Sequence, residues 1–66
     1  MPQPDARRPL TEAERREVFR ALVEAQDGGM AVPHSRKAVS RQFGLSDQRV
    51  RQIEQEGLEG QWPPLD

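Results

Sequence analysis

Long polar side chains that could read DNA bases are concentrated between residues 47 and 52. In the major groove, glutamine can pair with adenine and arginine with guanine through two hydrogen bonds each. If Val50 and Ile53 face inward on a helix, a rotation of about 100° per residue turns a row of glutamines outward. The side chains that we predict to contact bases are Arg51, Gln52, Gln48 and Asp47, of which Asp47 lies nearest the packed side and would mainly stabilise the start of the helix. The alternative is an ordinary solvated helix surface, since glutamine and arginine are good helix formers.

Basic residues gather in the middle of the chain, although the net charge of the whole is −1. Residues 34–51 carry five basic side chains and one acidic side chain, whereas residues 52–66 carry four acidic side chains and none that is basic. A local basic surface can bind phosphates whatever the overall charge, because the attraction depends on nearby charges. The residues that we predict to contact phosphates are Arg36, Lys37, Arg41 and Arg49. Charge alone fits a solvated surface equally well.

Other kinds of site find little support in the composition. The chain has no cysteine and a single histidine, which argues against metal sites built on sulfur or on histidine. We find no nucleophile paired with a base and no phosphate-binding loop, and we expect neither an enzyme nor a cofactor. No apolar run approaches the ~20 residues of a membrane span. We therefore expect a soluble, cytoplasmic protein.

The elements that must position these side chains can be placed from capping residues and apolar spacing. Thr11 and Glu14 form the pattern of a capping box, and the helix that follows should end near Asp27, before two glycines. We predict a connection over 28–34, a short helix over 36–43 capped by Ser35, and a third helix capped by Ser46. The third helix should extend through Glu56, with Gly57 or Gly60 as its end. We predict a disordered arm at residues 1–9 and a proline-containing tail at residues 61–66. We expect Trp62 in this tail to fold back onto the core.

The second and third of these helices fit the spacing of a helix-turn-helix. Such a motif needs a glycine in the turn, a small residue where the helices approach closely, and apolar residues at fixed inward positions. Gly44 and Ser40 meet the first two requirements. The inward positions hold Val39, Phe43, Leu45, Val50 and Ile53. The predicted fold class is therefore all-α, a three-helix bundle containing a helix-turn-helix at residues 10–60.

The stretch VSRQFGLSDQRVRQIEQEGL resembles region 4 of the bacterial RNA polymerase sigma factors of the sigma-70 family, and the preceding LTEAERREVFRAL is similar to that family's upstream helix. The resemblance covers about residues 10–58 and lacks the family's other domains, which implies a stand-alone relative. It implies that the third helix enters the major groove of promoter DNA. The matching reading positions are Asp47, Gln48, Arg51 and Gln52, of which the last two keep residue types typical of the family. At Asp47 and Gln48 the family usually has a basic and an acidic residue, so its promoter sequence is not carried over.

Together these features predict sequence-specific binding of duplex DNA and a role in transcription regulation. One such unit contacts few base pairs, so we expect a further partner: a second copy of the chain, another DNA-binding protein or RNA polymerase. The alternative is a protein-interaction module that docks on RNA polymerase or a regulator and has lost DNA binding. The acidic residues after Gln52 favour this alternative, because phosphates would repel them.

Overall fold

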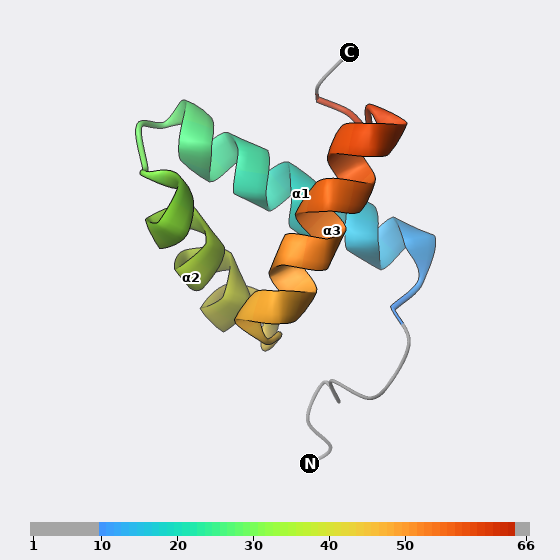
Figure 1. The fold of residues 1–66 in the computed structure, drawn as a ribbon, viewed down its shortest axis with the longest axis horizontal. Helices are drawn as coiled ribbons and strands as arrows, with labels where there is room; N and C mark the ends of the chain where they lie inside the picture. The colour runs from blue at the N-terminus through green and yellow to red at the C-terminus, as the bar shows by residue number, and fades with distance from the viewer. Residues whose placement is uncertain (1–9, 65–66) are drawn as a thin grey trace.

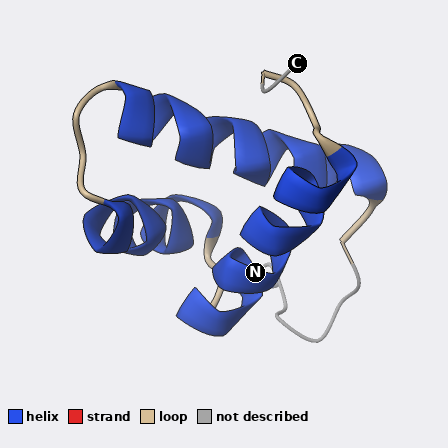
Figure 2. Cartoon of the chain, turned by 45° about the horizontal axis from the view of Figure 1, so that its top comes forward, coloured by secondary structure: helices blue, strands red, loops and turns tan. Residues whose placement is uncertain are grey.

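Residues 10–64 fold into three helices that pack against one another in a single bundle (Figure 1). The computed structural model describes residues 10–64, and the predicted arm at 1–9 and the last two residues of the tail lie outside this range. The helices are α1 (Glu12–Asp27), α2 (Val32–Phe43) and α3 (Asp47–Gly60). No strand occurs in the described range (Figure 2), which confirms the all-α prediction. Within it, no helix is both long enough and apolar enough to cross a membrane.

The first helix begins as its sequence predicts. The Thr11 side chain accepts a hydrogen bond from the Glu14 backbone N–H at 3.1 Å, and the Glu14 carboxylate accepts one from the Thr11 backbone N–H at 2.8 Å. This reciprocal pair satisfies two N–H groups that have no partner within the helix, so the capping box is confirmed. The helix ends at Asp27, before the two glycines, as predicted, and Gly29 has a positive φ of 100°.

The start of the second helix differs from the prediction. Ser35 does not cap it, because α2 begins three residues earlier at Val32, after an N-cap at Ala31 that makes no side-chain bond. Pro33 lies in the first turn, where a proline removes no hydrogen bond that the helix could make. The prediction gave too much weight to the preference of residues before proline for extended backbone.

The turn between α2 and α3 occurs at Gly44, as predicted. Gly44 has φ 68° and ψ 36°, a left-handed conformation that glycine adopts without steric cost. The Ser40 side chain donates a hydrogen bond to the Leu45 carbonyl, and the Leu45 backbone N–H donates to the Ser40 carbonyl at 2.9 Å. The Ser46 side chain then accepts from the Arg49 backbone N–H and so caps α3 as predicted.

The core lies between the three helices and is closed by the tail. Its buried apolar residues are Val18, Phe19, Leu22, Val39, Leu45, Val50, Ile53 and Trp62, and Phe43 is half-buried at its edge. Gly57 does not end α3; it is buried, and a Cβ placed there would lie 2.3 Å from the Phe19 ring. The missing side chain therefore lets α1 and α3 approach closely. Helix α3 continues to Gly60 and is capped by Gln61, with φ 51°.

Trp62 folds back onto the bundle, as predicted. Its ring meets the Phe19 ring edge to face, with centroids 6.0 Å apart, and the Arg16 guanidinium lies 4.9 Å from the ring centroid. Both contacts are favourable, since an aromatic ring has a positive edge and a negative face. The short tail thus covers the end of the α1–α3 interface.

Candidate nucleic-acid interface

The first two turns of α3 carry four exposed polar side chains, which we call the polar face of α3. They are the four predicted base-contacting residues, Asp47, Gln48, Arg51 and Gln52. On the opposite side of the same turns, Val50 and Ile53 are completely buried. Burial of these two apolar residues in the core therefore determines which side chains of α3 point to solvent.

The turn at Gly44 determines where the polar face lies in the molecule. Because the backbone turns there, α3 leaves α2 at a steep angle and its amino-terminal end lies at the edge of the bundle (Figure 1). Leu45 is buried directly after the turn and anchors it to the core. The polar face is thus held on a rigid, capped helix.

Two side-chain contacts lie along the polar face. The Asp47 Oδ2 and an Arg51 guanidinium nitrogen are 4.0 Å apart, across one helical turn. The Arg49 guanidinium donates a hydrogen bond of 3.4 Å to Gln52 Oε1. Arginine can only donate, so this contact uses the Gln52 oxygen and leaves its amide N–H groups available for other acceptors.

The predicted phosphate-contacting residues fall into two groups. Lys37 and Arg41 are exposed on α2, and Arg49 is half-buried beside the polar face. Arg36 is instead engaged between helices: its guanidinium donates to Glu54 on α3 at 2.9 Å, and the Glu54 side chain is only 15% exposed. A phosphate would have to compete with that carboxylate for Arg36.

Glu54 is the residue of this region whose role the sequence did not reveal. Besides Arg36 it accepts a 3.4 Å hydrogen bond from Gln26 on α1, and Gln26 also donates to the buried Ser35 hydroxyl at 3.1 Å. This network joins all three helices. Its hydrogen bonds join residues that are 9, 18 and 28 positions apart, so no local pattern could have indicated the network.

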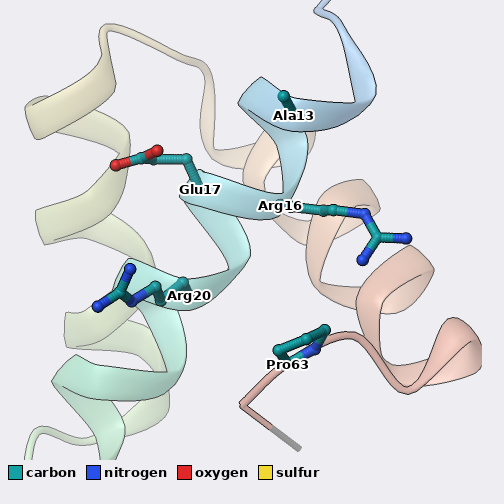
Figure 3. Close-up of a pocket in the computed structure, with 5 residues that line it drawn as sticks. All are labelled: Ala13, Arg16, Glu17, Arg20 and Pro63. Atoms are coloured by element: carbon teal, nitrogen blue, oxygen red, sulfur yellow. The ribbon is translucent and has the colours of Figure 1, made fainter.

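A shallow groove of about 300 Å³ lies between α1 and the tail. It is lined by Ala13, Arg16, Glu17, Arg20 and Pro63. Its charged side chains diverge: Arg16 extends toward the tail, whereas Glu17 and Arg20 extend away from it (Figure 3). Both arginines also have carboxylate partners on α1, at 2.8 and 3.0 Å. The groove therefore lacks the convergent polar groups of a ligand pocket.

Among residues 10–64, no three histidine or acidic side chains come together as a metal site would require. The exposed cationic and amide groups are thus the chemically distinctive feature of the described surface. They can donate hydrogen bonds to anions and to the base edges of nucleic acids.

Comparison with protein-family models, with curated proteins and with solved structures finds no match to this chain.

Proposed function

We propose that α2, the turn at Gly44 and α3 form a helix-turn-helix that binds duplex DNA with α3 in the major groove. The observation that carries the proposal is the exposure of four base-compatible side chains on the first two turns of α3, opposite fully buried Val50 and Ile53. An α-helix fits the major groove, and such helices present their amino-terminal residues to the bases. The binding is non-catalytic.

In this arrangement α2 contacts the DNA backbone. Lys37 and Arg41 are free of short ion pairs within residues 10–64 and can neutralise phosphates, with Arg49 as a third cation beside them. The second half of α3 must leave the groove, because it carries the exposed carboxylate of Glu59 and is joined to α1 by the Arg15–Glu56 ion pair at 3.1 Å. Duplex DNA therefore lies at the amino-terminal end of α3, and the helix points into the groove rather than running along it.

The biological role that follows is transcription regulation in the bacterial cytoplasm, in keeping with the resemblance to sigma region 4. A single unit covers few base pairs, so a second copy of the chain or RNA polymerase would supply the remaining affinity. The sequence resemblance supports RNA polymerase as this partner, and neither partner requires a catalytic group.

Titration of a labelled duplex with the full chain at two salt concentrations tests the proposal. We expect affinity to fall steeply with salt, because bound phosphates release counterions. Arg41→Ala should weaken binding to all sequences and reduce the salt slope by about one. Gln52→Ala should instead relax sequence preference at one base pair.

Arg20→Ala is the matched control, since it removes the same charge from an exposed position on α1, outside the proposed interface. Its affinity for DNA should stay close to that of the parent chain. Equal loss in Arg20→Ala and Arg41→Ala would contradict the assigned interface, and absence of any binding at low salt would contradict DNA binding altogether.

The second candidate is a protein-interaction module that docks on RNA polymerase or a regulator without binding DNA. The observation in its favour is the acidic second half of α3, where exposed Glu59 lies beside Leu58, a large apolar side chain that is 55% exposed. For this candidate, purified RNA polymerase should bind the chain while duplex DNA does not. Glu59→Lys should then weaken the polymerase complex.

A further inference from the structure

One acidic side chain lies within the otherwise cationic and neutral polar face of α3. Asp47 is in the first turn of the helix, and its carboxylate lies 4.0 Å from the guanidinium of Arg51. The two side chains are 62% and 61% exposed, so neither is held by the core. Their contact is therefore a property of the surface that DNA would meet.

This pair suits a base edge better than a phosphate. Phosphates attract isolated cations, whereas a carboxylate beside the arginine offsets its charge and is itself repelled by the DNA backbone. A base edge carries no net charge and presents acceptors and donors side by side. The pair offers both: donors on Arg51 and, on Asp47, an acceptor oxygen.

The pair also restricts which base can be read. Arg51 has a planar fork of donors, and a carboxylate on one side of the fork leaves the other side for the O6 and N7 acceptors of guanine. Gln52 reinforces this selection, since its oxygen already accepts a hydrogen bond from Arg49 at 3.4 Å and its amide N–H groups need acceptors.

We infer that Asp47 determines specificity: it positions Arg51 for two hydrogen bonds to a guanine and accepts one from the exocyclic amine of a neighbouring cytosine. The inference rests on the proposed DNA binding and makes it more specific, because it names the bases. Asp47 thus acts in recognition in addition to stabilising the start of α3.

Selection from a pool of duplexes randomised over one helical turn tests this inference. The bound duplexes are sequenced for the parent chain, Arg51→Ala, Asp47→Asn and Glu59→Gln. The parent should enrich guanine at one position, and Arg51→Ala should lose that preference by about 5- to 150-fold, the range for a pair of hydrogen bonds to one base. Asp47→Asn should weaken the same guanine preference by about two- to fivefold, as expected for an exposed ion pair, and should relax the neighbouring position.

Glu59→Gln is the matched control, because it makes the same carboxylate-to-amide change on an exposed residue of α3 outside the polar face. It raises the net charge equally, so it should increase affinity for all sequences without altering the selected bases. Circular dichroism of each variant reports whether α3 remains folded. An unchanged guanine preference in folded Asp47→Asn would overturn the inference while leaving DNA binding intact, whereas a parent chain that binds no duplex would overturn the proposed function itself.

Discussion

A methyl group at position 57 would lie 2.3 Å from a ring carbon of Phe19, closer than real side chains come. Phe19 is completely buried, so its ring can yield only by displacing other core residues. We expect Gly57→Ala to lower the free energy of unfolding by about 1–3 kcal/mol, the usual cost of overpacking a core. The better helix propensity of alanine returns at most about 1 kcal/mol of this. Urea unfolding followed by circular dichroism measures the difference.

Gly28→Ala is the control for this prediction. Gly28 has φ −76°, which any residue adopts, and a Cβ there would meet backbone oxygens at an ordinary 3.5 Å. It should leave stability within about 0.5 kcal/mol of the parent chain, as surface substitutions usually do. Equal stability of the two variants would show that α1 and α3 are not packed as closely as described.

Glu54 restrains Arg36, and this contact sets how strongly the chain should bind phosphates. Glu54→Gln removes a carboxylate that holds the Arg36 guanidinium at 2.9 Å but keeps a hydrogen-bonding side chain of the same size. We expect tighter binding to all duplexes and a steeper salt dependence, because one more cation becomes available. Stability should fall modestly, since Gln26 also loses a charged acceptor. Titrations at two salt concentrations provide the readout, and unchanged affinity would show that Arg36 does not face DNA.

At the level of helices, Gly44 is the residue on which the orientation of α3 depends. Its φ of 68° places it in the left-handed region, where an L side chain costs about 1–2 kcal/mol. Gly44→Ala should therefore lose about that much stability and weaken DNA binding in parallel. Gly44→Asn should lose less, because asparagine tolerates this conformation. Thermal unfolding of both variants tests the order, and an alanine variant as stable as the asparagine variant would contradict it.

Helix positions were predictable where the signal is local. The capping residues Thr11 and Ser46 and the turn at Gly44 each act within a few residues, and the sequence shows them directly. Ser35 misled the prediction because its hydroxyl satisfies a partner on another helix instead of capping its own. Gly57 was one of two predicted ends of the third helix, and the structure places it inside α3. The sequence alone does not distinguish a glycine that ends a helix from one that lets a neighbouring helix approach closely.

In the candidate site, too, features set by local sequence were predictable and features set by contacts between helices were not. The inward positions of Val50 and Ile53 fix the polar face of α3, so helical periodicity was sufficient to predict its exposure. Which cations are available depends on contacts between helices, and for that reason the engagement of Arg36 by Glu54 could not be read from spacing.

At the scale of the whole molecule, the charge of α3 changes along its length. Arg49 and Arg51 lie in the first two turns of α3. Glu54, Glu56 and Glu59 follow in its second half, where Arg15 of α1 pairs with Glu56 at 3.1 Å. In the proposed complex, this order of charges would favour approach of the amino-terminal end of α3, because phosphates attract arginines and repel carboxylates. It also makes the proposed binding of a polyanion compatible with a net charge of −1.

The stability of the whole bundle depends on its last aromatic residue. A core in a chain of this size supplies roughly 3–5 kcal/mol, and truncating a buried tryptophan to alanine costs about as much. Trp62 is 7% exposed and packs on Phe19 under the Arg16 guanidinium. We therefore expect Trp62→Ala to abolish cooperative thermal unfolding, and Trp62→Phe, which keeps an aromatic ring, to retain it at a lower midpoint. Leu58→Ala, at a side chain that is 55% exposed, is the control and should unfold like the parent. A Trp62→Ala chain that melts cooperatively at the parent's temperature would show that the three helices are stable without the tail.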